Sequence, residues 1–162
     1  MEGGILDGKG LCYKYKYKYR MDDNNKPRVT GIGGIFFFSE DPEKTKEWYR
    51  DNLGMEVNEW GSSIEFRNTH QPEEINYLQW SPFEKASDYF APSRKEFMIN
   101  YRVEHLEELL VKLRQNGVTI LDEVETYEYG KFVHIMDAEG NKIELWEPID
   151  SAFTEMGLKT TK

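Results

Sequence analysis

The sequence has a single cysteine, Cys12, and it has no long apolar run. One cysteine excludes an intramolecular disulfide, so the composition favours a reducing compartment and we expect a cytoplasmic protein. No segment approaches the about eighteen apolar residues that a membrane span requires, and the N-terminus lacks the apolar stretch of a signal peptide. The sequence therefore predicts that the chain has no membrane partner and is not exported.

Positive charge is scarce in most of the chain. The 162 residues carry a formal net charge of −9, and after residue 28 there are fourteen of the 21 Lys and Arg but 26 of the 30 Asp and Glu. This field repels a phosphate backbone, which argues against nucleic acid and favours a small-molecule partner. With 38% apolar residues, the length suits one domain with a substantial core.

The first 28 residues form an N-terminal arm and linker that differ from the rest. The segment "YKYKYKYR" (13–20) alternates strictly between tyrosine and a cation. It is either a strand at a sheet edge or a basic aromatic arm that stacks on nucleotides or lies on an anionic surface. The polar segment "MDDNNKP" (21–27) predicts a linker. We expect the folded domain to span residues 29–148, followed by a C-terminal tail at 149–162.

Residues 29–81 predict a first unit of the type β-α-β-β-β. "GIGGIFFF" (31–38) is a buried strand, and "SEDPEKTKEWYRDNLG" is a helix with Ser39 or Asp41 as its cap and Gly54 as its stop. The apolar stripe of this helix consists of Thr45, Trp48, Tyr49 and Leu53. Three strands are predicted after the helix, at 55–60, 63–67 and 75–80.

Residues 97–148 repeat this plan as a second unit. A strand at 97–103 precedes a helix whose buried face consists of Leu106, Leu109, Leu110 and Leu113, and further strands are predicted at 118–126, 131–136 and 142–146. Gly117 ends this helix 63 residues after Gly54 ends the first. A repeat of this size indicates two similar units side by side. The segment between them, residues 82–96, is expected to be a linker across the surface.

Two such units, a helix entered by "DPEKTKEWYRDNLGM" and a final hairpin "DAEGNKIELWEP" resemble the vicinal oxygen chelate superfamily. This superfamily includes glyoxalase I, bleomycin-resistance proteins and extradiol dioxygenases, and the resemblance covers Val29 to about Pro148. It implies an α+β, glyoxalase-like fold in which curved mixed sheets enclose a cavity. Members of this superfamily are often dimers, so the resemblance also implies a homodimer.

In metal-dependent members, the ligands lie on the first and last strands of each unit. The resemblance places these four positions at Gly34, Gln79, Met98 and Glu144. Glu144 alone is a strong ligand, whereas a catalytic zinc normally has three protein ligands of the His, Glu or Cys type. We therefore expect no cofactor, with a divalent metal on Glu144 at a non-standard site as the alternative.

The final hairpin predicts a partner for Glu144. If residues 137–141 form its turn, His134 faces Glu144 and Phe132 faces Trp146 on the same side of the sheet. A neighbouring imidazole and carboxylate are either a satisfied polar pair, a general acid/base pair, or half of a metal site. The sequence leaves all three interpretations open.

The aromatic content, 14% of the chain, indicates what the cavity would bind. We expect it to be lined by the candidate ligand-binding residues Gly34, Phe36, Gln79, Met98, Asn100, Phe132 and Trp146. Such walls suit a flat or partly apolar small molecule. The predicted function is therefore small-molecule binding. The alternative is a lyase, isomerase or dioxygenase that uses Glu144 and His134 as acid and base or binds a non-standard metal.

Overall fold

The computed structural model describes residues 26–69 and 71–162. The Tyr/Lys segment at 13–20 and most of the predicted linker lie outside the described residues. The first half consists of β1 (Arg28–Ser39), α1 (Pro42–Leu53), β2 (Ser62–Phe66) and β3 (Asn76–Glu84). The second half consists of β4 (Phe97–Glu104), α2 (Leu106–Gln115), β5 (Glu125–Tyr127), β6 (Gly130–Met136), β7 (Lys142–Pro148) and α3 (Asp150–Met156).

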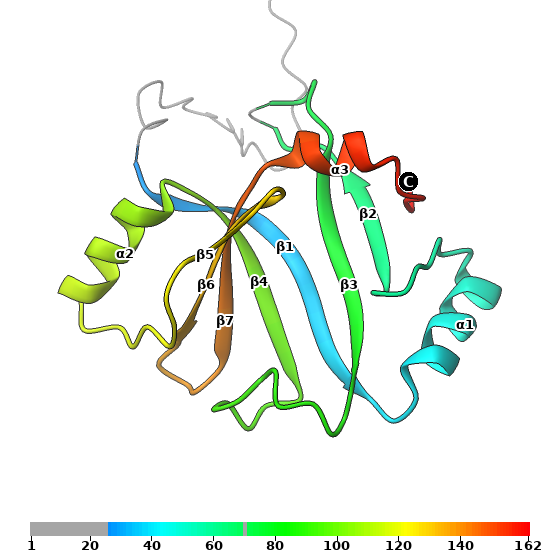
Figure 1. The fold of residues 1–162 in the computed structure, drawn as a ribbon, viewed down its shortest axis with the longest axis horizontal. Helices are drawn as coiled ribbons and strands as arrows, with labels where there is room; N and C mark the ends of the chain where they lie inside the picture. Colours follow the sequence, from blue (N-terminus) through cyan, green and yellow to red (C-terminus); the bar gives the residue numbers. More distant parts are fainter. Residues whose placement is uncertain (1–25, 70) are drawn as a thin grey trace, which may run out of the picture.

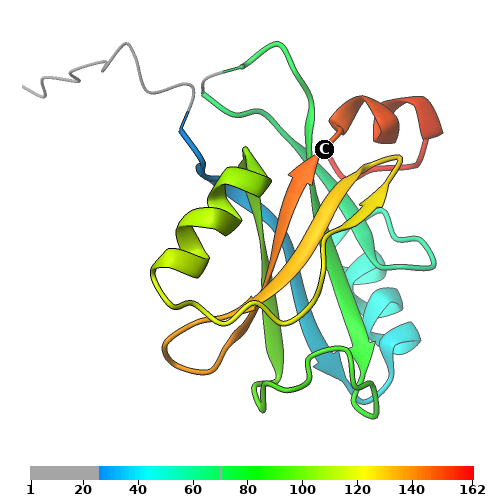
Figure 2. The same cartoon turned by 60° about the vertical axis from the view of Figure 1, so that its left-hand side comes forward.

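The strands form one seven-stranded mixed sheet in the order β2-β3-β1-β4-β7-β6-β5. The first strands of the two halves, β1 and β4, are antiparallel neighbours at its centre. Each of them pairs in parallel with the last strand of its own half, β3 or β7. The sheet is strongly curled, with α1 and α2 at its two ends and α3 across one end of the strands (Figures 1 and 2). The predicted α+β, glyoxalase-like fold of two repeated units is confirmed.

Two of the predicted strands are largely absent. Residues 55–60 form only an isolated bridge between Asn58 and Gly61, and the buried amine of Lys46 donates to the carbonyl oxygens of Asn58 and Glu59 at 3.3 and 3.0 Å. The ammonium group of Lys46 thus hydrogen-bonds to carbonyl oxygens that would otherwise accept hydrogen bonds from a neighbouring β-strand. In the predicted strand at 118–126, only an isolated bridge from Ile120 to Ile135 and the start of β5 pair with β6.

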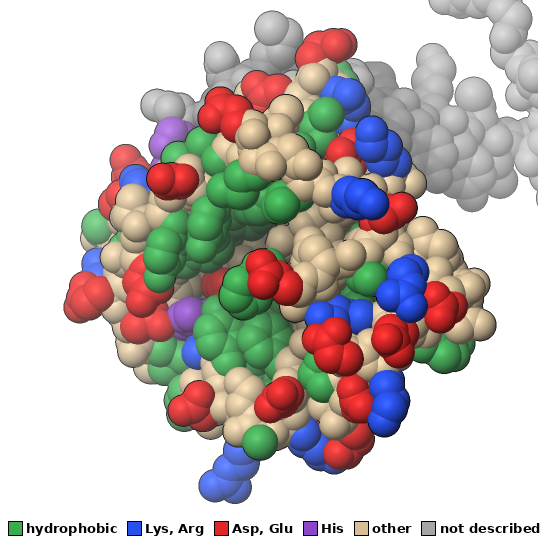
Figure 3. Space-filling view, turned by 45° about the vertical axis from the view of Figure 1, so that its right-hand side comes forward, with side chains coloured by type: hydrophobic (Ala, Val, Ile, Leu, Met, Phe, Trp, Pro, Cys, Tyr) green, Lys and Arg blue, Asp and Glu red, His purple; other side chains and the backbone are tan. Residues whose placement is uncertain are grey.

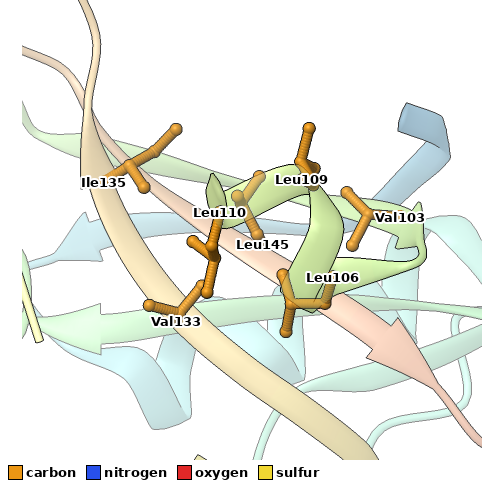
Figure 4. Packing of buried hydrophobic residues seen from close by; sticks show 7 residues of the cluster. All are labelled: Val103, Leu106, Leu109, Leu110, Val133, Ile135 and Leu145. Atoms are coloured by element: carbon orange, nitrogen blue, oxygen red, sulfur yellow. The ribbon is translucent and has the colours of Figure 1, made fainter. Parts of the chain in front are cut away.

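The two helices differ in how they pack. The predicted leucine face of α2 is confirmed, because Leu106, Leu109 and Leu110 are buried against Val133 and Leu145 on the convex face of the sheet (Figure 4). The predicted apolar stripe of α1 is largely wrong: Trp48 and Leu53 are exposed, and Tyr49 packs on Trp80 with ring centroids 4.5 Å apart. Asp41 caps α1 by accepting a hydrogen bond from the N–H of Lys44 at 3.0 Å.

The segment expected to cross the surface folds onto the concave face instead. Strand β3 continues to Glu84, and Phe90 is buried against Phe38 with ring centroids 4.3 Å apart. The rings of Phe83 and Phe90 supply the reason, since packing them against Phe36 and Met98 outweighs the polarity of their neighbours. None of the helices in the described part of the chain has the length and apolar character needed to cross a membrane.

The last residues are more structured than a tail. After α3, Thr161 pairs in parallel with Ile64 beside β2, where its backbone exchanges hydrogen bonds with Ser63 and Glu65 at 2.9 and 2.8 Å. The chain end therefore lies along an edge of the sheet and holds α3 in place from its C-terminal side.

Candidate functional site

Six residues lie in register across the concave face of the sheet. Ser63 is paired with Gln79, Gln79 with Gly34, Gly34 with Asn100, Asn100 with Glu144, and Glu144 with His134. We call this set the cross-sheet row. Because paired residues in neighbouring strands point to the same face, five strands place polar groups beside one another, and glycine on β1 leaves a gap in the middle.

Glu144 is the most buried charged group of the row, with 3% of its surface exposed. Tyr89 donates its hydroxyl proton to Oε1 of Glu144 at 3.2 Å, and Asn100 lies beside Glu144 in register on β4. Burial raises the pKa of Glu144 above its ordinary value, and the nearby His134, Tyr89 and Asn100 oppose this rise. The geometry therefore favours a carboxyl group that takes up a proton more readily than an exposed one.

His134 lies next to Glu144, as the hairpin register predicted. Its Nε2 is 3.8 Å from Oε1 of Glu144, and among the described residues this buried nitrogen has no hydrogen-bond partner. On the other side of the ring, Nδ1 lies 2.6 Å from Oδ2 of Asp122. The backbone N–H of His134 also donates to Asp122, at 2.7 Å. Asp122 thus fixes the ring with a proton on Nδ1 and directs Nε2 toward Glu144.

The segment between the two units supplies the third neighbour of Glu144. Tyr89 stacks on Phe83 with ring centroids 5.0 Å apart and packs edge-on against the ring of His134. Lys142 donates to the carbonyl oxygen of Tyr89 at 2.7 Å, which holds the loop against the sheet. Burial and the charge of Glu144 raise the pKa of the Tyr89 hydroxyl, so this group acts as a hydrogen-bond donor and not as an anion.

The two amides of the row are oriented by their neighbours. Ser63 donates to Oε1 of Gln79 at 2.9 Å, which leaves the amide nitrogen of Gln79 for the cavity. Oδ1 of Asn100 is buried without a partner among the described residues. A Cβ at Gly33 would lie 2.2 Å from this oxygen and 2.8 Å from the ring of Trp146. Gly33 lies at a register shift in β1, and its lack of a side chain makes room for both groups.

A cavity of about 420 Å³ lies above the row. Its polar lining consists of Gln79, Asn100 and Glu144, and its walls are formed by Phe36, Trp60, Tyr129, Phe132, Trp146, Phe153, Met156 and Leu158. In the space-filling view, hydrophobic side chains surround a hollow in the molecular surface (Figure 3). The size and composition are typical of sites that bind a small molecule, with apolar walls and a few polar groups on the floor.

One wall of the cavity comes from α3 and the residues after it. Asp150 forms a buried ion pair with Arg102 on β4 and also accepts a hydrogen bond from Asn76 at 3.2 Å. The guanidinium of Arg102 lies over the ring of Trp146, 5.0 Å from its centroid. The start of α3 is therefore fixed to the sheet, and this directs Phe153 toward Trp146, with ring centroids 5.7 Å apart.

A second hollow, of about 610 Å³, lies at the end of the sheet near the start of α2. Its lining is more polar, but several of its charged groups already have partners. Glu147 accepts a hydrogen bond from the N–H of Leu106 at 3.2 Å, and Glu104 lies 3.3 Å from Arg28. The cavity above the cross-sheet row, with its buried carboxyl group, is the stronger candidate for a functional site.

The structure brings together most of the candidate residues but not Met98. Asn100, and not Met98, lies in register with Gly34, while Met98 pairs with Phe36 and is fully buried against Phe36 and Phe90. Residues 98 and 100 share one face of β4, so strand alternation could not distinguish them. Gly34 lies in the row, and Phe36, Gln79, Asn100, Phe132, Glu144 and Trp146 line the cavity.

Sequence reasoning missed several residues of the site. Asp122 and Tyr89 meet His134 and Glu144 from loops 12 and 55 residues away in sequence. The wall residues of α3 were assigned to a tail, although Asp150 near its start and Gly157 at its end are typical helix-boundary residues. This pattern was the one signal that could have found them.

Comparison with known proteins agrees with this architecture. The model of the Glyoxalase/Bleomycin resistance protein/Dioxygenase superfamily matches residues 31–145. The chain belongs to this superfamily. Among curated proteins, no sequence matches the chain.

Solved structures of similar fold include two methylmalonyl-CoA epimerases. The enzyme from Mycobacterium tuberculosis is 22% identical with a TM-score of 0.53, over 78% of this chain and 93% of that one. An epimerase in complex with methylmalonyl-CoA and NH4+ is 20% identical with a TM-score of 0.56, over 75% of this chain and 96% of that one. At these identities the likeness shows the fold alone.

Proposed function

We propose that this protein binds a small, largely apolar molecule in the cavity above the cross-sheet row, without a divalent metal at the superfamily's ligand positions. The observation that carries the proposal is the donor set at those positions. The resemblance suggested Gly34, Gln79, Met98 and Glu144 for these positions, and Asn100 is the residue of β4 that lies in register with Gly34 and Glu144. The row therefore supplies one carboxylate, two amides and no side chain at all on β1.

This donor set does not fit a standard catalytic metal site. Zinc takes three protein ligands of the His, Glu or Cys type, and amide oxygens are weak donors beside a carboxylate. Within the described ranges, no three His, Cys, Asp or Glu residues are grouped so that they could hold a metal ion. Glu144 and His134 make at most a pair, since the other ring nitrogen of His134 is committed to Asp122. No step of the proposed function therefore passes through a metal.

A ligand screen by thermal shift tests the binding proposal. A ligand present at a hundredfold excess over its dissociation constant stabilises the fold by about 2.7 kcal/mol. Two exposed tryptophans provide a matched pair of variants: Trp60 lines the cavity and is 71% exposed, whereas Trp48 on α1 is 55% exposed and does not line it. We expect Trp60→Ala to weaken the binding of hits and Trp48→Ala to leave it unchanged. Hits that are insensitive to Trp60→Ala would contradict the proposed location.

A second candidate function is proton transfer by Glu144, with His134 as its partner. The unpartnered Nε2 of His134, 3.8 Å from the carboxylate, is the observation that favours it. With Asp122 holding Nδ1, a proton taken up by Glu144 from a ligand can be shared with Nε2. This arrangement suits removal and return of a proton next to a carbonyl group.

Deuterium exchange tests this second function. The protein is incubated in D2O with a panel of small ketones and thioesters, and loss of the proton signals next to the carbonyl is followed by NMR. We expect any exchange above background to be abolished by Glu144→Gln and to be retained by Glu139→Gln in the exposed hairpin turn. Equal exchange in both variants would contradict a role of Glu144 as the base.

A further inference from the structure

The described lining of the cavity above the cross-sheet row carries a negative charge and no positive charge. Among the described residues that line it, Glu144 is the only one with a charged side chain. The nearest basic groups are committed elsewhere: Arg102 is paired with Asp150, and Lys142 donates to the carbonyl oxygen of Tyr89. The ring of His134 does not line the cavity and lies between the carboxylates of Asp122 and Glu144. A negatively charged ligand would therefore lie against a buried carboxylate without a cation of its own, which is strongly unfavourable in a largely apolar site.

The floor of the cavity also has more hydrogen-bond acceptors than donors. An ionised carboxylate offers about four acceptor positions, and Tyr89 occupies one of those on Glu144. Beside it, the carbonyl oxygen of Asn100 is a second acceptor without a donor among the described residues. The amide nitrogen of Gln79 is the donor that the row offers in return. A ligand that donates hydrogen bonds would therefore complement the floor of the cavity.

The aromatic walls of the cavity favour a flat ligand. Phe132 and Trp146 are stacked with an interplanar angle of 9°, and the ring of Phe153 meets Trp146 edge-on at 74°. Flat rings pack into such walls with offset or edge-to-face contacts, and aromatic faces also attract cations.

From these three observations we propose that the cavity takes a flat aromatic molecule that carries no negative charge and presents an N–H group to Glu144, with a protonated amine as the most tightly bound form. This inference rests on the proposed binding function and adds the chemical class of the ligand. It separates this chain from the epimerases of similar fold, since methylmalonyl-CoA carries a carboxylate.

Four probes with the same ring system test the proposal: tryptamine, indole, 1-methylindole and indole-3-acetate. Their dissociation constants are measured by ligand-observed NMR titration at neutral pH. We expect tryptamine to bind most tightly. Indole should bind at least about tenfold more tightly than 1-methylindole, which has lost the N–H that donates to the carboxylate. Indole-3-acetate keeps this N–H but should bind at least about tenfold more weakly than indole, because its carboxylate would be buried beside Glu144 without a cation.

Two variants assign these differences to the carboxylate. Glu144→Gln keeps the shape of the side chain and removes its charge, so it should weaken tryptamine about tenfold, change indole far less, and strengthen indole-3-acetate. Glu139→Gln removes the same charge from the exposed hairpin turn and should change none of the four.

The outcomes separate this inference from the binding function itself. Indole-3-acetate binding as tightly as indole, 1-methylindole binding as tightly as indole, or no binding of any of the four probes would overturn the ligand class. The binding function would still stand if other compounds of the thermal screen bound in a manner that Trp60→Ala abolishes. It would fall together with the ligand class if no compound did so.

Discussion

The buried carboxyl group of Glu144 is surrounded by polar groups of the protein itself. Tyr89 donates to it, Asn100 lies beside it in register, and His134 adds an imidazole nitrogen at 3.8 Å. These partners offset part of the cost of burial, and burial still raises the pKa of Glu144. The pKa of Glu144 should therefore respond to the charge and polarity of any ligand that enters the cavity.

The raised pKa of Glu144 predicts a dependence of stability on pH. The folded chain holds this proton more tightly than the unfolded chain, so the contribution of Glu144 to the free energy of unfolding should fall as the pH rises above the ordinary value of 4.5. Glu144→Gln removes this ionisation. The free energy of unfolding of the variant, minus that of wild type, should therefore increase between pH 4 and pH 7 in urea titrations. A difference that decreases over this range would show that the pKa is lowered and not raised.

Gly33 is predicted to be essential to the floor of the cavity. A Cβ at this position would lie 2.2 Å from Oδ1 of Asn100, whereas one at Gly31 would lie 3.8 Å from the nearest atom, in Arg102. We expect Gly33→Ala to cost about 1–3 kcal/mol in urea unfolding. Gly31→Ala, on the same strand, should be neutral or stabilising. Equal effects of the two substitutions would contradict the close packing at Gly33.

Sequence reasoning worked at the residue scale where geometry is local. A five-residue turn fixes the hairpin register, so the pairing of His134 with Glu144 and of Phe132 with Trp146 could be predicted and is confirmed. Tyr89 could not be predicted, because its contact with Glu144 depends on how a 55-residue stretch of chain folds back. Asn100 was named for the cavity but not for the row, since a shift of two residues leaves alternation unchanged.

At the scale of elements, a buried ion pair fixes the start of α3, which closes one side of the cavity. The side chains of Arg102 and Asp150 are 6% and 16% exposed. Asp150→Ala would leave Arg102 buried without its partner, and we expect a loss of about 3–5 kcal/mol in the free energy of unfolding. Asp51→Ala, which removes an aspartate of an exposed ion pair with Arg50, provides the control and should have little effect. Equal losses would show that α3 is not held by this contact.

The elements themselves were predicted unevenly. The leucine spacing of α2 gave the buried face correctly because the helix covers the sheet through that face. The same reasoning failed for α1, whose Trp48 and Leu53 are exposed in the single chain. Periodicity shows which residues share a face, but it does not show whether another element covers that face.

For the whole molecule, the convex face between α1 and α2 is where we expect a second copy to bind. The central strand β1 exposes Val29, Ile32 and Ile35 there, and Ile35 is 40% exposed. A homodimer would bury these side chains. Light scattering should give twice the 19.2 kDa chain mass for wild type and for Val111→Lys on α2. Ile35→Lys should give a mass near that of one chain. A monomeric wild type would contradict the expectation.

The two-unit plan of the whole molecule was readable from the sequence because Gly54 and Gly117 mark equivalent helix ends. The course of the last fourteen residues was not. These residues form a cavity wall with Phe153, Met156 and Leu158. Their course depends on long-range contacts with the folded sheet, which local sequence patterns do not show.

The proposed function requires that the cross-sheet row holds no divalent metal at Glu144. Metal titration of chelator-treated protein is the most direct test of this requirement. Isothermal titration with Zn²⁺, Mn²⁺, Co²⁺ and Ni²⁺ is compared between wild type and Glu144→Gln, in protein without a histidine tag. With Gly34, Gln79 and Asn100 in place of strong ligands, no binding that depends on Glu144 is expected. One-to-one binding of any of these ions that Glu144→Gln abolishes would contradict the proposed function.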